Sequence, residues 1–237
     1  FFFPKKKKKK KKKKRLRYQM EHELLQRYPM LGANAISQLS NMRLRASSKQ
    51  EEIVSGFNRQ LTLERVLMSK SGLELFAAHL VKELSLENIL YLIEYMQLKH
   101  FISIHQSHLL QYNDVRAVGF RVEICSSLIV ENLHPCLLRV NIPISSAWQI
   151  CLNMFAYLYS HYILDTSVAC LNISFDSTAS IQRAMSQLHQ YPSLDMLPSL
   201  ITAFDAATID VLHLLRGDSF LRFQKSPEGL TYSKDFV

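Results

Sequence analysis

Residues that break helices are scarce in this sequence. It contains only 6 glycines and 7 prolines among 237 residues, whereas 48% of the residues are hydrophobic. Few positions are therefore suited to tight turns, and from about Lys49 onward the pattern predicts one compact domain made of long elements.

Cysteines are few and do not group. Cys125, Cys136, Cys151 and Cys170 are separated by 11, 15 and 19 residues, so neither a CxxC pair nor a metal-ligand spacing occurs. A chain of this length can bury a core without disulfides. The sequence predicts reduced, mostly buried thiols in a cytosolic protein, and no metal site.

Long apolar runs are also missing. No stretch of 18 or more consecutive apolar residues occurs, so no membrane span is expected within this sequence. No secretory signal is expected either, because no short apolar core follows the basic residues near the N-terminus. The three phenylalanines at residues 1–3 would also fit the end of a spanning helix that precedes this sequence.

Acidic residues are absent from the first 17 residues, which carry 12 basic side chains. This segment accounts for the formal net charge of +9, since the other 220 residues hold 17 basic and 20 acidic side chains. The body of the protein is weakly acidic, and the overall charge therefore does not point to nucleic acid as the partner.

The lysine run begins at Lys5 and ends at Lys14, and it cannot fold on itself because like charges repel. One interpretation is a tether to anionic lipid, where each lysine would add roughly 1 kcal/mol of binding. A nucleic-acid patch is disfavoured by the lack of interleaved aromatic residues, and low-complexity sequence is the third interpretation. We define residues 1–17 as a basic low-complexity tail and residues 18–48 as a linker or short helix of unknown role.

Apolar residues recur with a helical period on both sides of a polar corner. Ser71-Gly72 separates two apolar stretches. The residues after it form the stripe of an amphipathic helix: Leu73, Phe76, Ala77 and Leu80. Ser85 is placed to cap a second helix that would run to about Leu98. The corner between the two helices should face solvent with its polar residues Glu83, Ser85, Glu87 and Asn88.

The C-terminal third has the same period and predicts a helix that starts near Asp205, with Pro227 and Gly229 closing the folded part. Leu214, Asp218 and Arg222 follow one another at intervals of four residues, so a helix that continues past Gly217 would place them on one outward stripe. Taken alone, the spacing favours a solvated Asp-Arg pair worth a few tenths of a kcal/mol.

Two of these segments resemble the regulator-of-G-protein-signalling (RGS) domain family. They are Lys82-Glu83-Leu84-Ser85-Leu86-Glu87-Asn88-Ile89 and Leu214-Leu215-Arg216-Gly217-Asp218-Ser219-Phe220-Leu221-Arg222-Phe223. The resemblance is colinear over most of residues 49–232, which we define as the RGS-like domain. It includes Gln50-Glu51-Glu52 and Asn172-Ile173-Ser174-Phe175-Asp176-Ser177. Phe57 and Leu92 stand where the family usually has Trp.

The resemblance implies an all-α, RGS-like helical bundle with an irregular insertion between the central helices. It also implies a GTPase activator of a heterotrimeric G-protein α subunit (Gα). The implied Gα-contacting residues are Glu83, Leu84, Ser85, Glu87, Asn88, Ser174, Leu214, Asp218, Ser219 and Arg222. The chain itself should carry no catalytic residue and no cofactor, because GTP, Mg²⁺ and the catalytic Arg and Gln belong to Gα. The implied location is cytoplasmic, at the inner face of the plasma membrane if the lysine run binds lipid.

The resemblance also implies a role for several of these residues. Asn88 should hydrogen-bond near the switch of Gα that bears the catalytic Gln, with Ser174 beside it. Asp218, supported by Arg222, should accept backbone N–H groups from the first switch. Because serine reaches less far than the asparagine common in the family, Ser174 should alter rate or partner preference.

The interval from Asn88 to Ser174 is longer than the family needs. It spans 86 positions, roughly twice the usual length, and the surplus falls at about residues 101–148. Residues 120–124 alternate like a strand. A loop insertion extruded from the bundle, a translated intron, and a regulatory or partner-binding segment are the open interpretations.

Two other functions stay open beside the GTPase activator. One is a non-catalytic RGS-homology scaffold that binds Gα or another signalling partner. The other is a basic membrane or nucleic-acid binder driven by the lysine run, for which deletion of residues 1–17 would abolish binding. The same deletion should change Gα affinity little if either of the first two functions is correct.

Overall fold

The computed structural model describes residues 61–105, 109–110, 122–131, 137 and 143–235. Within these ranges the chain forms helices and turns and no strand, which confirms the predicted all-α class. The described residues divide into two compact units. Unit 1 takes its residues from Phe1–Leu86 and Ser219–Val237, and unit 2 is Glu87–Asp218. The predicted tail (1–17), the linker (18–48) and the start of the predicted domain, including Phe57, lie outside the described residues.

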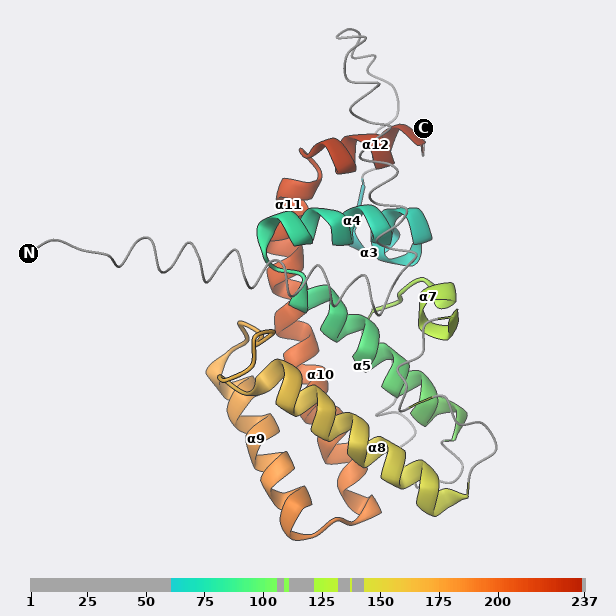
Figure 1. Cartoon of the computed structure of the whole chain (residues 1–237), viewed down its shortest axis with the longest axis vertical. Helices are drawn as coiled ribbons and strands as arrows, with labels where there is room; N and C mark the ends of the chain where they lie inside the picture. Colours follow the sequence, from blue (N-terminus) through green and yellow to red (C-terminus); the bar gives the residue numbers. More distant parts are fainter. Residues whose placement is uncertain (1–60, 106–108, 111–121, 132–136, 138–142, 236–237) are drawn as a thin grey trace, which may run out of the picture. The chain divides into compact units, whose positions relative to one another are not determined.

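Among its described residues, unit 1 has four helices around one aromatic cluster. They are α3 (Leu63–Met68), α4 (Lys70–Glu83), α11 (Phe220–Phe223) and α12 (Pro227–Asp235). Helix α4 is the centre of the unit, because α3, α11 and α12 all pack against it (Figure 1). Phe76 of α4 meets Phe220 and Phe223 of α11 edge to face, with ring centroids 6.3 and 5.1 Å apart. Such pairs add packing specificity to a buried apolar core.

The first helix break lies at Ser69, two residues before the predicted Ser71-Gly72. The Ser69 side chain accepts a hydrogen bond from the backbone N–H of Gly72 at 3.2 Å and so caps α4. Gly72 lies inside the helix, where a Cβ would come within 2.7 Å of the Val66 carbonyl oxygen and 2.8 Å of the Tyr232 ring. The glycine therefore serves close packing rather than a turn.

The end of α4 explains why the next helix begins later than predicted. Leu84 has the left-handed backbone conformation (φ 60°, ψ 39°), and its N–H and that of Ser85 donate to the carbonyls of Val81 and Leu80 at 3.3 and 3.0 Å. This is a Schellman ending with leucine where glycine is usual. The chain needs two further residues to turn, so α5 is Glu87–Ile104 rather than residues 85–98.

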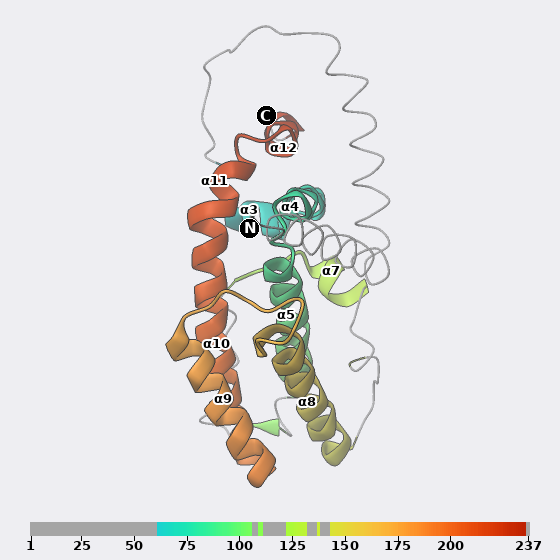
Figure 2. The same cartoon turned by 60° about the vertical axis from the view of Figure 1, so that its left-hand side comes forward.

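Unit 2 is a helical bundle whose central helices are α5 and α10. It contains α5 (Glu87–Ile104), α7 (Ser126–Glu131), α8 (Ile144–Leu158), α9 (Phe175–Gln190) and α10 (Leu197–Leu214). Helix α5 packs against α7, α8 and α10, and α9 packs against α10 (Figures 1 and 2). Helix α10 starts eight residues before the predicted Asp205, because Pro198 occupies its first turn, where proline is favoured.

In the part of the chain that the structure describes, three short helical turns join the longer helices. They are η3 (Tyr159–Ile163), η4 (Leu194–Met196) and η5 (Leu215–Ser219). The π-turn η5 directly follows α10, so the helical path continues past Gly217, as the stripe of Leu214 and Asp218 requires. Helical turns of this wider type are frequent at functional sites.

The described parts of the predicted insertion pack against the bundle. Helix α5 reaches into the segment as far as Ile104, and α8 begins inside it at Ile144. Helix α7 lies against α5. Val122 and Ile124 are only 8% and 6% exposed and belong to no strand. Where it is described, the segment is thus neither strand-like nor extruded.

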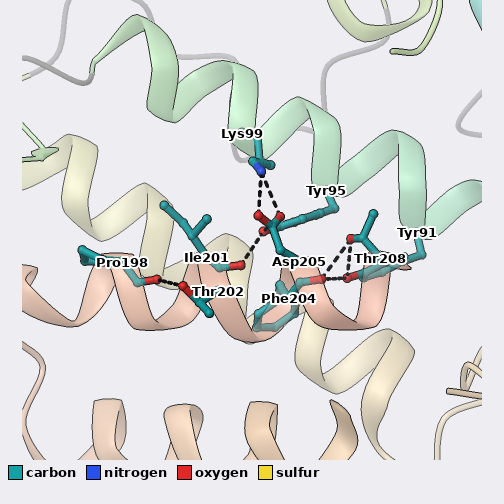
Figure 3. A network of polar contacts seen from close by, with 9 residues as sticks. All are labelled: Tyr91, Tyr95, Lys99, Pro198, Ile201, Thr202, Phe204, Asp205 and Thr208. Atoms are coloured by element: carbon teal, nitrogen blue, oxygen red, sulfur yellow. Dashed lines mark hydrogen bonds and ion pairs between the residues drawn. The ribbon is translucent and has the colours of Figure 1, made fainter. Parts of the chain in front are cut away.

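A buried ladder of polar side chains joins α5 to α10 (Figure 3). Tyr91, Tyr95 and Lys99 recur every four residues on one face of α5. The Lys99 ammonium is fully buried and lies 2.8 and 3.1 Å from the two carboxylate oxygens of Asp205. The Tyr95 hydroxyl lies 2.9 Å from the same carboxylate, and the Tyr91 hydroxyl donates to the Phe204 carbonyl at 2.9 Å. These buried hydrogen bonds and the ion pair can all form at only one alignment of α5 along α10, so the ladder fixes how the two helices are aligned.

The described run Leu194–Phe223, which includes α10, has the length and composition of a membrane span. Its most apolar 18-residue window has a mean hydropathy of 1.3. More than half of that window, 56%, is buried inside the protein. Burial of this kind is also what the central helix of a bundle shows, so the run is weak evidence for a membrane segment.

Candidate functional site

The ten predicted Gα-contacting residues divide equally between the two units. Unit 1 contains Glu83, Leu84, Ser85, Ser219 and Arg222, and unit 2 contains Glu87, Asn88, Ser174, Leu214 and Asp218. Each group forms its own local arrangement within its unit.

Three of the predicted residues of unit 1 meet at one carboxylate. Arg222 Nη2 donates to Glu83 Oε2 at 2.9 Å, and Arg222 Nε donates to Glu83 Oε1, so the pairing is bidentate. The Ser219 hydroxyl is a further hydrogen-bond partner of Glu83. His79 Nε2 lies 3.2 Å from Glu83 Oε1, one helical turn earlier on α4. We call these four residues the Glu83 cluster.

The Glu83 cluster keeps its carboxylate ionised. Burial raises the pKa of Glu83, but the hydrogen bond from Arg222, the electrostatic influence of His79 and Arg222 and the Ser219 hydroxyl together bring it below its ordinary value. The bidentate geometry fixes the guanidinium plane relative to the helix end. The ion pair of Arg222 described here is with Glu83, whereas its support of Asp218 stays a prediction.

Leu84 and Ser85 are half-buried, and their backbones form the end of α4. Because a left-handed conformation costs a residue with a Cβ roughly 1–2 kcal/mol, Leu84 is held in place by its surroundings. Strain of this kind is common at binding sites. It gives the Leu84 side chain a direction that a regular helix ending would not give.

In unit 2, Ser174 is held by two elements at once. As the N-cap of α9, its Oγ accepts from the Ser177 backbone N–H at 3.2 Å. Its hydroxyl and its own backbone N–H both donate to Asp210 Oδ2 on α10, at 2.7 and 3.0 Å. Asp210 was not among the predicted residues. The available signal was its position four residues before Leu214 and eight before Asp218, which extends the same stripe.

The Asp210 carboxylate is stabilised in its charged form. Burial raises its pKa, but the hydrogen bonds from the Ser174 side chain and backbone, a hydrogen bond from Ser177 and the electrostatic influence of His213 lower it further than burial raises it. At neutral pH, Asp210 is therefore an acceptor only, and the groups that face it are donors.

An open hollow of about 430 Å³ lies beside Ser174. It is lined by Asn172, Ser174, Asp210, His213, Leu214, Gly217 and Asp218. The fold thus brings together three predicted residues, Ser174, Leu214 and Asp218, that are up to 44 positions apart in sequence. Two carboxylates and one histidine give the hollow a negative edge at neutral pH, which favours a partner group that carries N–H donors or positive charge.

Glu87 and Asn88 begin α5, and both are more enclosed than predicted. Asn88 is only 7% exposed, so the expectation that the whole corner faces solvent is wrong for this residue. Its side-chain amide donates to Glu87 Oε1 at 3.3 Å. Burial raises the pKa of Glu87 to about 7. The carboxyl therefore titrates within the physiological range, which the sequence did not suggest.

Within the described ranges, no group of three or more His, Cys, Asp or Glu side chains is arranged to hold a metal ion.

Comparison with known proteins identifies one family. The model of the Regulator of G protein signaling domain matches residues 62–228, well over half of the chain, and all ten predicted contact residues lie inside the match. No curated protein and no solved structure matches the chain. Residues 49–61 and 229–232 of the predicted domain fall outside the matched range. Because this match covers more than half of the chain and the described residues are all-helical, the chain belongs to the regulator of G protein signaling family.

Proposed function

We propose that this chain is a GTPase activator of a heterotrimeric Gα. The observation that carries the proposal is the family match, which spans every residue of the predicted contact set. RGS domains generally bind Gα subunits, so the partner class follows from family membership, whereas the acceleration of GTP hydrolysis is the further step proposed here.

The proposed mechanism is differential binding of a conformation. The chain would bind the switch regions of Gα most tightly in the shape they take during hydrolysis, which lowers the barrier without any catalytic group of its own. GTP, Mg²⁺, the catalytic Arg and the water-orienting Gln would all come with Gα. Asp218 and Leu214 would receive the first switch at the hollow, and Ser174 and Asn88 would face the switch that bears the Gln.

A non-catalytic RGS-homology scaffold is the second candidate. One observation favours it: Asn88 is only 7% exposed. A domain in which this side chain is enclosed would bind Gα and yet orient the Gln too weakly to speed hydrolysis.

We further propose that the chain acts in the cytoplasm. The lysine run between Lys5 and Lys14 would add contact with anionic lipid at the inner face of the plasma membrane. No nucleic-acid partner is proposed, because the residues outside the tail are weakly acidic overall. Binding to vesicles with and without anionic lipid, compared between the full chain and a variant lacking residues 1–17, tests this part.

Single-turnover GTP hydrolysis by a Gα of the inhibitory type tests the main proposal. The full chain should accelerate hydrolysis, and Asn88→Ala and Arg222→Ala should each reduce the acceleration by about tenfold or more, as expected for the loss of a hydrogen bond to a charged or buried group. Arg183→Ala is the matched control, because Arg183 is an exposed arginine of α9 outside the predicted set. It should leave the rate unchanged.

A binding measurement separates the two candidates. If the full chain binds Gα in a transition-state-mimicking form but does not accelerate turnover, the scaffold function replaces the activator. If it neither binds nor accelerates several classes of Gα, both candidates fail and only the family fold remains.

A further inference from the structure

The Ser174 hydroxyl lies within hydrogen-bonding distance of two side chains, Asp210 and Ser177. A serine hydroxyl has one proton to donate and two lone pairs that accept. Asp210 Oδ2 lies 2.7 Å from Ser174 Oγ, a short distance typical of a charge-assisted hydrogen bond, and a carboxylate can only accept. The Ser174 proton is therefore directed to Asp210.

The remaining capacity of Ser174 follows from its second neighbour. One lone pair of Oγ accepts the Ser177 backbone N–H at 3.2 Å. The Ser177 hydroxyl oxygen, 3.0 Å from Ser174 Oγ, is placed to accept from Ser174, but Asp210 Oδ2 is nearer at 2.7 Å and charged, so the Ser174 proton goes to Asp210. One lone pair of Ser174 Oγ is then left for the hollow. Ser174 can offer an incoming group an acceptor but no donor.

We propose that Asp210 is a positioning residue that fixes the rotamer and the hydrogen-bond polarity of Ser174, so that Ser174 accepts from an N–H donor of the Gα switch region. This inference rests on the proposed function. A free serine would rotate and present either a proton or a lone pair, whereas the Asp210 bonds remove that choice before the partner arrives. A side-chain amide presents N–H donors and suits this geometry.

The backbone contact adds to the restraint. The Ser174 N–H donates to the same Asp210 oxygen at 3.0 Å, so one carboxylate oxygen holds both the backbone and the side chain of this residue. The bonds cross from α10 to α9 over 36 positions of sequence. A shift of α10 against α9 would therefore move Ser174 directly.

The contact itself is tested without Gα. In ¹H–¹⁵N NMR spectra of the full chain, the Ser174 amide proton should lie downfield and exchange slowly with solvent. Asp210→Ala should move it upfield and speed its exchange about tenfold, as the loss of a hydrogen bond to a charged acceptor predicts. Asp210→Asn keeps an oxygen acceptor and should give an intermediate shift.

A double-mutant cycle in the single-turnover assay tests the role of Asp210 in the reaction. The assay measures two quantities separately: the maximal hydrolysis rate at saturating concentrations of this protein, and the protein concentration that gives half of that rate. Ser174→Ala and Asp210→Ala should each lower the maximal acceleration about tenfold. The double variant should be no slower than Ser174→Ala, because Asp210 acts through the hydroxyl. Ser174→Thr keeps the hydroxyl and should retain most of the acceleration.

Asp195→Ala is the control for loss of a carboxylate, because Asp195 is exposed in unit 2 and lies outside the hollow. It should change neither the spectrum at Ser174 nor the rate. If the two single effects add fully, or if only the half-saturating concentration changes, the positioning role is overturned while the activator proposal stands. If the unmodified chain accelerates no Gα, the activator proposal fails, and the positioning role fails with it whatever the NMR spectra show.

Discussion

Replacing Lys99 by methionine should destabilise unit 2 by about 3–5 kcal/mol, the usual cost of removing one partner from a buried ion pair. Lys99 is fully buried, and its ammonium donates to both oxygens of Asp205 at 2.8 and 3.1 Å. Methionine fills most of the lysine volume, so little of the loss comes from a cavity. The loss arises because the Asp205 carboxylate stays buried without its cation.

The sequence offers a probe that is specific to this unit. Trp148 is the one tryptophan of the chain, and it lies in α8 of unit 2. Urea unfolding followed by tryptophan fluorescence therefore reports on unit 2 even if unit 1 unfolds separately. The midpoint of the Lys99→Met variant should move to lower urea with an unchanged slope.

Two further variants decide whether the ion pair is the cause. Lys99→Met combined with Asp205→Leu removes both charges and should recover at least half of the lost stability, because apolar replacements of buried pairs are often neutral. Arg183→Met removes an exposed cation from the same unit and should change stability by less than about 0.5 kcal/mol. The reasoning is refuted if Lys99→Met costs under about 1 kcal/mol or if the double variant is the less stable of the two.

Four further outcomes are expected. Burial raises the pKa of Glu87 from 4.5 to about 7, so the folded state favours the protonated carboxyl and loses stability as the pH rises through that value. Unit 2 should therefore be about 1 kcal/mol less stable at pH 8 than at pH 6 in unfolding followed by Trp148 fluorescence. Glu87→Gln should remove this difference. Leu84→Gly should relieve the strain of the left-handed conformation and raise the free energy of unfolding by about 1 kcal/mol, while it weakens Gα binding. A lower free energy of unfolding together with weaker binding would contradict the strain argument. Gly72→Ala should lower the unfolding free energy by about 1–3 kcal/mol, because its Cβ would collide with the Val66 carbonyl and the Tyr232 ring. Gly217→Ala should instead raise the unfolding free energy by about 0.5–1 kcal/mol, because no atom lies within 4 Å of the new Cβ. If both glycine variants changed the unfolding free energy in the same direction, the packing role of Gly72 would be refuted.

The short-range features of this protein follow from its sequence. Apolar residues at helical intervals predicted the helices before and after residues 83–88 and the C-terminal helix. The local motifs around Asn88 and Asp218 predicted the family that residues 62–228 match. These features depend on contacts between residues three or four positions apart, so one sequence displays them directly.

Helix boundaries depended on packing and were predicted less well. The sequence predicts a break at Ser71-Gly72, but Ser69 caps the helix and Gly72 lies within α4, where Tyr232, far away in sequence, leaves no room for a side chain. The start of α5 moved to Glu87 because Leu84 adopts a conformation that leucine alone would not favour. In both cases tertiary contacts overrode a local preference.

The partners of the candidate site residues were decided by tertiary structure alone. Glu83 meets Arg222 across 139 positions, Ser174 meets Asp210 across 36, and Lys99 meets Asp205 across 106. The sequence determined which residues carry charge and hydroxyl groups and which helix face each one occupies. Only the packing of helices far apart in the chain determined which carboxylate faces which donor, because hydrogen bonds and ion pairs depend on positions within a few tenths of an ångström that no sequence interval specifies.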